Sequence, residues 1–501
     1  MTTSATARGV GFRSDRGPVL IAVMLSTALV ALDSTIIATA VPSVVQDLGG
    51  FAQFPWLFSI YLLTQAVTVP LYGKFADVLG RRPVMFFGIA AFLVGSVLCG
   101  AAWSMPVLIA ARAVQGIGAG AIQPMSMTVI GDLYTVEERA RVQGYVASVW
   151  GAASVVGPTL GGLFAEYLDW RWIFFINLPL GAIAALMLHR NFSERVERKP
   201  HKVDYLGAAL LTIGCSLVIL GLLEGGVAWA WGSVPSVAIF VAGAALLVAF
   251  VLVEKRAAEP VLPLWVFTRR VLVGGNLVAL VVGAVLMGLT SYLPTYAQGV
   301  LGAGALVAGF AVAALTVGWP ISASLAGKIY LRIGFRDTAL IGSVFIILGG
   351  VLVALLGAGS SLWAAAFAAF VLGVGLGLAA SPTLVAIQSV VGWDRRGVVT
   401  ATNLFSRSLG SAVGAAVFGA IANATLASRF ASPPAGVGPL PPSVDATSLV
   451  LGGHADSPAA VYVRGALADA THYVFLGLLA VAVLSVGALL LMPRKTEQLE
   501  F

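Results

Sequence analysis

Charged residues are scarce in this chain of 501 residues, and their scarcity excludes most kinds of soluble protein. Only 10% of the residues are Asp, Glu, Lys or Arg, whereas 59% are hydrophobic. A water-soluble chain is about 25% charged, so too little polar surface is present here to cover a water-facing globule. The same composition excludes an intrinsically disordered chain. The sequence therefore predicts an integral membrane protein.

Several sequence features that would mark other functions are also missing. The two cysteines, Cys99 and Cys215, both lie inside apolar runs, which excludes a disulfide scaffold and suggests no metal site. The net charge is +7, but the basic residues are scattered rather than gathered in one tract, so nucleic acid is not an expected partner. No Gly-Lys-Ser/Thr loop is present to bind a nucleotide. We therefore expect no metal, no cofactor and no ATP hydrolysis.

Fourteen apolar runs are long enough to cross a bilayer, because ~20 helical residues span its hydrocarbon core of ~30 Å. This count predicts an all-α polytopic membrane fold. The predicted spans are 18–41, 55–76, 83–103, 105–131, 142–165, 171–189, 204–224, 234–253, 271–297, 305–328, 337–357, 361–391, 400–428 and 471–492.

The basic residues indicate the orientation of these spans. With the N-terminus inside, 24 of the 29 Lys and Arg residues fall in inside segments, and only Arg171, Arg429 and Arg464 fall outside. This bias is the positive-inside rule, and one miscounted span would destroy it. We expect both termini to be cytoplasmic. The first span resembles a signal peptide in its flanking arginines and small residues, but its length and Asp33 favour a retained helix. The excess of Arg over Lys favours a bacterial cytoplasmic membrane.

An internal repeat indicates two halves. The segment that begins Gly73-Lys74 and reaches Gly80 has the same glycine spacing as the segment from Gly327-Lys328 to Gly334. Such repeats are usual in secondary transporters. We therefore predict a six-helix bundle over 1–189, a cytoplasmic linker with two inserted helices over 190–270, and a second six-helix bundle over 271–501. A Pro-, Gly-, Ser- and Ala-rich segment near 430–470 reads as a long extracytoplasmic loop of the second bundle.

Four motifs resemble those of the major facilitator superfamily. The first, from Gly73 to Arg82, resembles its signature loop, and the second is Arg112-Ala-Val-Gln115-Gly116. The third, from Gly151 to Gly162, resembles the motif associated with antiporters. The fourth, Leu32-Asp33-Ser-Thr35, resembles the first-span motif of the fourteen-helix drug:proton antiporters. The residues that carry the signature loop are Gly73, Asp77, Gly80, Arg81 and Arg82, and those of the antiporter motif are Gly151, Gly157, Pro158, Gly161 and Gly162.

The resemblance implies efflux of lipophilic drugs by alternating access, driven by the proton motive force. An endogenous lipid, siderophore or secondary metabolite is the alternative cargo. A membrane-embedded transferase is the rival from another class, but no histidine lies near a lipid-buried acid, so we expect no enzyme. Oligomerisation is not indicated, and a monomer is expected. The resemblance also implies that Asp77 contacts the start of the thirteenth span, near Arg395 and Arg396; a plain turn of the positive-inside kind is the simpler alternative.

Ionisable residues inside the spans are the strongest functional candidates, because burying a charge in lipid is costly. A helical rise of ~1.5 Å per residue places Asp33 ~22 Å above the inner side and Arg112 ~10 Å below the outer side, so both lie at the same depth. We predict that they pair, either as a structural ion pair or as a site where Asp33 exchanges a proton with the outside.

The substrate cavity is predicted less sharply. Arg407 is placed ~13 Å into its span, where it would bind an anionic substrate or pair with an acid. Relatives in the resembled branch that handle dications tend to have further acids in later spans, whereas the later spans here lack an interior acid. The resemblance therefore does not imply export of dications, and monovalent cationic, neutral and anionic lipophiles stay open. Glu224 reads as an interfacial residue and Asp132 as a brace of the gate. The remaining cavity candidates, each of which could equally be a packing residue, are Tyr61, Gln65, Gln123, Trp150, Tyr292, Tyr296 and Asn403.

Overall fold

Each predicted span forms a helix in the computed structural model, which describes residues 10–49, 53, 56–194, 204–226, 228–257, 259–431, 434 and 458–495. The helices in chain order are α1 (Gly17–Leu48), α2 (Trp56–Leu79), α3 (Arg81–Gly100), α4 (Met105–Leu133), α5 (Val136–Tyr167), α6 (Trp172–Phe175), α7 (Asn177–Asn191), α8 (Tyr205–Glu224), α9 (Val234–Glu254), α10 (Arg270–Gly299), α11 (Ala305–Ile333), α12 (Phe335–Ala354), α13 (Leu362–Ser389), α14 (Trp393–Phe430) and α16 (Pro458–Leu490).

The lengths and composition of these helices confirm an all-helical membrane protein. Within the described ranges, 13 helical segments are long and apolar enough to cross a membrane, with α6 and α7 taken as one. The remaining predicted span is α2, whose 24 residues also suffice to cross. Polar residues such as Gln65 and Lys74 make α2 less apolar than its neighbours. The predicted number of spans therefore fits the helices that form.

Several helices extend beyond the apolar runs that predict them. α5 begins at Val136 because Thr135 and Glu138 form a capping box, in which each side chain bonds the other residue's backbone N–H. α16 begins at Pro458, so the expectation of a loop over all of 430–470 is wrong at its C-terminal end. Hydropathy detects only the lipid-facing part of a helix, and the polar ends escape it. The rest of that loop (432–433 and 435–457) and most of the predicted linker (195–203) lie outside the described residues.

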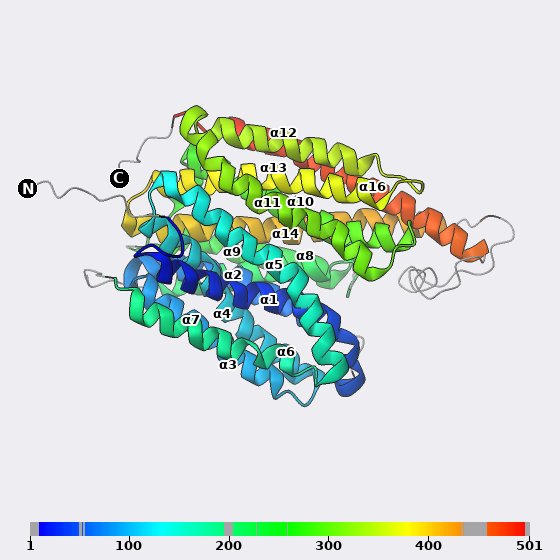
Figure 1. Cartoon of the computed structure of the whole chain (residues 1–501), viewed down its shortest axis with the longest axis horizontal. Helices are drawn as coiled ribbons and strands as arrows, with labels where there is room; N and C mark the ends of the chain where they lie inside the picture. The colour runs from blue at the N-terminus through cyan, green and yellow to red at the C-terminus, as the bar shows by residue number, and fades with distance from the viewer. Residues whose placement is uncertain are drawn as a thin grey trace, which may run out of the picture.

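The helices pack side by side in two groups (Figure 1). α1 to α7 contact mostly one another, and so do α10 to α16. α5 against α11 and α2 against α14 join the groups, and α8 contacts α9, α2 and α14. We call α1–α7 the N-half and α10–α16 the C-half. The exact domain boundaries expected from the sequence stay a prediction.

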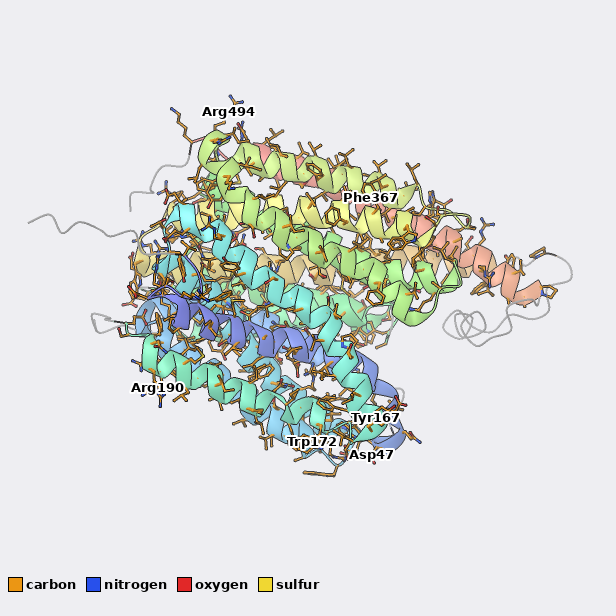
Figure 2. The ribbon with its side chains drawn as sticks, in the orientation of Figure 1. Asp47, Tyr167, Trp172, Arg190, Phe367 and Arg494 are labelled. Carbon is orange, nitrogen blue, oxygen red and sulfur yellow. The ribbon has the colours of Figure 1, made fainter. Side chains whose placement is uncertain are left out.

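Residues of opposite character mark the two ends of the bundle. Arg190 and Arg494 lie at one end, whereas Asp47, Tyr167 and Trp172 lie at the other (Figure 2). The positive-inside rule predicts that the first end is cytoplasmic, and we call it the cytoplasmic end. In Figure 1 the two halves converge at the cytoplasmic end and diverge toward the outer end.

The repeated loops share a backbone conformation as well as a sequence. Gly80, between α2 and α3, has φ 96°, and Gly334, between α11 and α12, has φ 91°. Only glycine adopts this region without strain. The internal repeat therefore marks equivalent turns in the two halves.

Candidate functional site

Asp33 and Arg112 form an ion pair inside the N-half. The Arg112 guanidinium donates to the Asp33 carboxylate at 2.6 Å, and each residue is only 1% exposed. The pair joins α1 to α4 at the depth that the helical rise predicts. Each of the two buried charges requires the other for stability, because an uncompensated buried charge is strongly destabilising.

Three further polar side chains surround the pair. Gln115 donates to the second Asp33 oxygen at 2.6 Å, and Asn177 approaches the same oxygen at 3.4 Å. The Ser96 hydroxyl lies 3.0 Å from the Gln115 amide nitrogen and 3.3 Å from that of Asn177. α3, α4 and α7 thus all contribute to a network around one carboxylate of α1. The sequence offers only a weak signal for this network, namely polar residues within apolar runs.

Tyr61 of α2 covers the pair on the side of the arginine. The Arg112 guanidinium carbon lies 4.1 Å from the centre of the Tyr61 ring, a cation–π distance. The Tyr61 hydroxyl is buried without a hydrogen-bond partner among the described residues. The sequence predicts Tyr61 in the lining of the substrate cavity, whereas it packs within the N-half against Arg112.

The antiporter-like motif on α5 connects the pair to the C-half. A Cβ at Gly157 would lie 2.0 Å from the Thr35 hydroxyl, so α5 packs directly against α1 two residues beyond Asp33. Thr35 in turn donates to the Ala153 carbonyl at 3.0 Å. A Cβ at Gly151 would lie 3.0 Å from the Thr316 carbonyl of α11. The helix therefore touches α1 and α11 at once, and it continues through Pro158.

The remaining glycines of this motif differ in surroundings. Gly161 is buried on α5, whereas nothing lies within 4 Å of a Cβ at Gly162.

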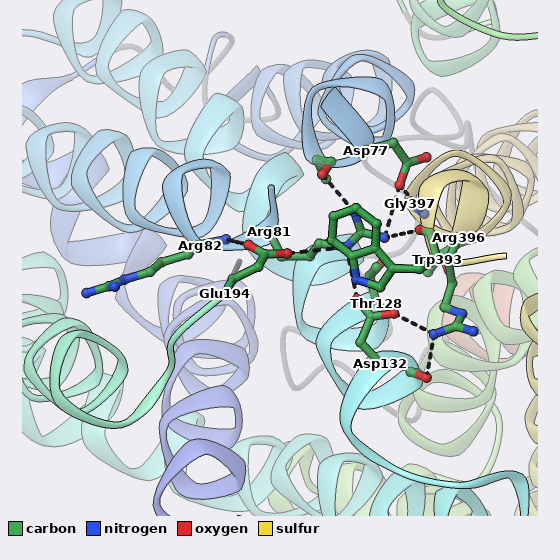
Figure 3. A network of polar contacts seen from close by, with 12 residues as sticks. Asp77, Arg81, Arg82, Thr128, Asp132, Glu194, Trp393, Arg396 and Gly397 are labelled. Carbon is green, nitrogen blue, oxygen red and sulfur yellow. Dashed lines mark hydrogen bonds and ion pairs between the residues drawn. The ribbon is translucent and has the colours of Figure 1, made fainter. Parts of the chain in front are cut away.

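A second charged group closes the cytoplasmic end (Figure 3). Asp77 at the end of α2 accepts from the backbone N–H groups of Gly397 and Val398, both at 2.8 Å. Gly73 allows this approach, because a Cβ there would lie 2.4 Å from the Ala401 side chain. The contact predicted for Asp77 with the start of α14 is present, one to two residues beyond Arg396.

Arg81 holds the centre of this cluster. It is fully buried and contacts Asp77 at 3.2 Å and Asp132 at 2.9 Å. Its guanidinium lies 3.8 Å from the centre of the Trp393 ring. From the C-half, Arg396 reaches the other Asp132 oxygen at 2.5 Å. Asp132 thus bridges the halves as a brace, and we call these five residues the latch.

Glu194 and Arg82 extend the latch toward the segment after α7. A Glu194 oxygen accepts from the Arg82 backbone N–H at 3.0 Å, and the Arg82 side chain donates to the His189 carbonyl at 3.1 Å. Nothing in the sequence singles out Glu194 or Trp393. Their roles depend on which helix ends meet, and that follows only from the packing.

Burial alters the titration of the latch acids. It raises the pKa of Asp77 to about 7, against the opposing influence of Arg81 and the two backbone N–H groups. Burial also raises the pKa of Glu194, against the Arg82 N–H and Arg81. Both carboxyls are therefore easier to protonate in the closed latch than in water.

Other contacts close the cytoplasmic side between the halves. The Tyr330 hydroxyl of α11 donates to the Val136 carbonyl of α5, and the Ser381 hydroxyl bonds Gln143 at 2.6 Å. An apolar cluster, which we call the floor cluster, lies between α2, α4 and α14. It consists of Val69, Met127, Ala401, Leu404 and Phe405. These contacts thus join the two halves at the cytoplasmic end.

The other predicted cavity residues fall into two groups. Gln65, Gln123, Trp150, Tyr292 and Arg407 are partly exposed. Asn403 instead donates to the Gly275 carbonyl of α10 at 3.0 Å. Tyr296 is 2% exposed in the apolar core of the C-half, where its hydroxyl donates to the Gly357 carbonyl at 2.8 Å.

Glu224 lies at the end of α8, as the sequence predicts, and its side chain is buried. It is 4% exposed at the outer end of α8 and bonds the Ser59 side chain of α2. Its interpretation as an interfacial residue stays a prediction, and at this outer end α8 packs against α2.

Comparison with known sequences gives a consistent family. A model of the Major Facilitator Superfamily matches residues 23–415. The multidrug transporter protein MdtP of Bacillus subtilis is 35% identical over 414 residues, which are 83% of this chain and 76% of MdtP. Multidrug resistance protein 3 of the same organism is 33% identical over 404 residues, 80% of this chain and 79% of that protein. A fungal relative, the efflux pump dotC of Dothistroma septosporum, is 32% identical over 402 residues, 79% of this chain and 69% of the pump.

A solved structure shares the fold. The crystal structure of the human organic anion transporter MFSD10 (TETRAN) matches with a TM-score of 0.60, over 93% of this chain and 99% of that one. The sequences are 15% identical, so this likeness concerns the fold alone.

Proposed function

The chain belongs to the major facilitator superfamily, and on this premise we propose that it exports lipophilic small molecules across the membrane in exchange for protons. Its relatives MdtP and multidrug resistance protein 3 are named for multidrug transport or resistance, and dotC is named an efflux pump. The proposed setting is a bacterial cytoplasmic membrane, with both termini in the cytoplasm and the monomer as the working unit.

The observation that carries proton coupling is the Asp33–Arg112 pair. It is a titratable acid with one charged partner, buried within the membrane-spanning part of the N-half. A proton from the outside would neutralise Asp33 and leave Arg112 without its counter-ion. Because a lone buried charge is unfavourable, the helices around it would then move until Arg112 finds other partners or water.

α5 offers a route from this event to the C-half. It contacts α1 through Gly157 and Thr35, and α11 through Gly151 and Thr316. A shift of α1 on protonation of Asp33 would therefore displace α5, the helix that joins the halves. Rocking of the halves would break the latch, open the cavity to the cytoplasm and release the proton there.

The closed latch supports an outward-facing resting state. Asp77, Arg81 and Arg396 hold α2 and α4 against α14 at the cytoplasmic end. Substrate release would occur from this state, and substrate loading would require the latch to open. Gly73 lets α2 approach α14, Gly80 permits the turn between α2 and α3, and Arg82 lies in the first turn of α3.

Proteoliposomes test this function directly. With an imposed pH gradient, acidic on the side that corresponds to the outside, we expect uphill movement of lipophilic fluorescent dyes, and collapse of the gradient should stop it. Asp33→Asn should reduce this movement to the level of protein-free liposomes. Asp47→Asn is the matched control, because Asp47 lies on the same helix with its side chain 47% exposed. Proton-driven transport at the wild-type rate in Asp33→Asn would disprove the coupling site.

The same assay separates the alternative cargoes. Extracts that contain endogenous lipids, siderophores or secondary metabolites can compete with the dye. Strong inhibition by one such fraction, with weak transport of synthetic drugs, would indicate an endogenous cargo.

A further inference from the structure

Arg407 occupies a place on α14 that faces the space between the halves. Asn403 and Gly410, one turn to either side along α14, contact α10. Leu404, three residues earlier, contacts α2 and α4 through the floor cluster. Residues three or four apart share one side of a helix, so Arg407 lies between the side that meets α10 and the side that meets α2. It is ten residues beyond Gly397, or ~15 Å above the latch.

Two glutamines lie at the level of Arg407. Leu404, Val69 of α2 and Met127 of α4 meet in the floor cluster. α2 and α4 run inward, whereas α14 runs outward, so one turn above this cluster stand Gln65 on α2, Gln123 on α4 and Arg407 on α14. The three residues are partly exposed. Three helices thus bring one guanidinium and two amides to a single level above an apolar floor.

These three side chains have no partner among the residues that the structure describes. Within those residues, no hydrogen bond or ion pair involves the guanidinium of Arg407 or either amide. The described acids of the C-half are elsewhere: Asp337 and Asp394 lie in the first turns of α12 and α14, and Asp469 of α16 pairs with Arg429. Arg407 is therefore a permanent charge without a counter-ion from the described part of the chain.

We propose that Arg407, Gln65 and Gln123 form a subsite that binds a carboxylate group of the transported molecule. A guanidinium presents paired N–H donors that match the two oxygens of a carboxylate, and each amide adds N–H donors. The apolar floor cluster suits the lipophilic remainder of such a molecule. This inference rests on the proposed export function and names its substrate class: lipophilic monocarboxylates.

The subsite also selects against other charges. A cation in the same space would meet the uncompensated Arg407 charge, and charge repulsion of this kind is a common source of specificity. A neutral amide of the same shape would gain the apolar contacts but not the bidentate pair. Matched probes that differ only in this group therefore isolate the contribution of Arg407.

Binding to the purified full-length protein in lipid nanodiscs tests the subsite. The probes are 7-diethylaminocoumarin-3-carboxylate, its carboxamide, and the carboxamide that bears a trimethylammonium group. Each is titrated against wild type, Arg407→Gln and Arg407→Lys. Arg332→Gln is the control, because Arg332 is exposed at the cytoplasmic end of α11 and the variant loses the same net charge.

We expect wild type to bind the carboxylate at least tenfold more tightly than its carboxamide. Arg407→Gln should abolish this preference, leave carboxamide binding within about twofold, and strengthen binding of the trimethylammonium probe. Arg407→Lys should retain part of the preference, because an ammonium keeps the charge without the fork of donors. Arg332→Gln should behave as wild type.

Two outcomes would overturn the subsite. One is a wild-type protein that binds the carboxylate no better than the carboxamide. The other is an Arg407→Gln variant that retains the wild-type preference for the carboxylate over the carboxamide. Failure of proton-driven transport in proteoliposomes, with the carboxylate preference intact, would instead disprove the export function and leave the binding site standing.

Discussion

Arg112 of the N-half and Arg407 of the C-half, both far from the ends of their helices, have opposite surroundings. In the N-half, Arg112 is 1% exposed and contacts the Asp33 carboxylate, the Gln115 amide and the Leu57 carbonyl. In the C-half, Arg407 is partly exposed and lacks any side-chain partner in the described ranges. The halves share a repeated sequence pattern and equivalent turns at Gly80 and Gly334, yet they use a buried cation differently.

This difference separates two tasks that a coupled transporter must perform. A cation with a titratable partner responds when that partner gains a proton, so Arg112 suits coupling. A cation without a partner stays charged and available, so Arg407 suits ligand recognition. Because the two arginines lie in different halves, the charge that would respond to protonation is separate from the charge that would bind substrate, and movement of helices would link them, as alternating access requires.

Removal of the Arg112 charge should have the largest effect on stability. We expect Arg112→Leu to destabilise the protein by about 3–5 kcal/mol, because Asp33 is then buried without its cation. Thermal unfolding of the detergent-purified protein measures the loss. Asp33→Asn in the Arg112→Leu background should recover part of it, since the orphaned charge is gone. An unchanged melting temperature in Arg112→Leu would mean that the pair is not buried as described.

Giving Arg407 a partner should make it resemble Arg112. Gln123→Glu places a carboxylate at the level of the guanidinium, and the resulting ion pair should weaken binding of the coumarin carboxylate by about tenfold, or ~1.4 kcal/mol. Titration in nanodiscs gives this value. Gln46→Glu, the same change at an exposed position of α1, serves as the control. Retention of full carboxylate affinity in Gln123→Glu would place Gln123 away from Arg407.

The latch provides a third set of charges, and its pH dependence sharpens the contrast with permanently charged Arg407. The closed state holds a proton on Asp77 with a pKa of about 7, whereas an open latch exposes the carboxyl to water, where its pKa returns toward ~4. Acidification from pH 8 to pH 6 should therefore favour the closed latch several-fold, because protons favour the state that binds them more tightly.

Fluorescence energy transfer across the cytoplasmic end measures this shift. Dyes on cysteines that replace Arg190 and Arg494, at the same end of the two halves (Figure 2), report its opening. The native cysteines Cys99 and Cys215 are buried, which limits background labelling. Asp77→Asn should flatten the profile between pH 6 and 8. A wild-type latch that opens on acidification would contradict the expected direction of the shift.

Removal of the Arg407 charge should have the smallest effect on stability. Arg407→Leu discards a partly exposed cation that pairs with none of the described residues, and we expect a gain of about 1 kcal/mol or less, in contrast to the loss in Arg112→Leu. The same unfolding assay compares the two variants directly. A loss of several kcal/mol in Arg407→Leu would show that the arginine has a structural partner.

The sequence predicts well how deep a residue lies within the membrane. It predicts poorly which way that residue's side chain points around its helix. The level shared by Asp33 and Arg112 follows from the regular rise of a helix between two apolar limits. That Ser96 and Asn177 also join the network around Asp33 does not, because the rotation of α3 and α7 depends on which neighbours they pack against. Tyr296 shows the same limit: its place along α10 is clear from the sequence, but it points into the core.

The contacts at helix ends are predictable only where a motif names them. Asp77 carries a family pattern, so its contact with α14 can be inferred. Glu194 and Trp393 carry none, and they complete the latch because two chain segments far apart in sequence meet at the cytoplasmic surface. Hydropathy also misses the outer turns of α16, whose composition there includes Arg464 and Asp469.

The position of α8 affects the path by which lipophilic molecules would pass from the inner leaflet to the space between the halves. α8 contacts both α2 and α14, so it lies over the line along which those helices part when the latch opens. A compound that moved from the acyl chains toward this line would meet α8 first. α8 would then screen the lateral opening between α2 and α14 from bulk lipid. We therefore expect α8 and α9 to select which membrane-dissolved compounds pass between α2 and α14.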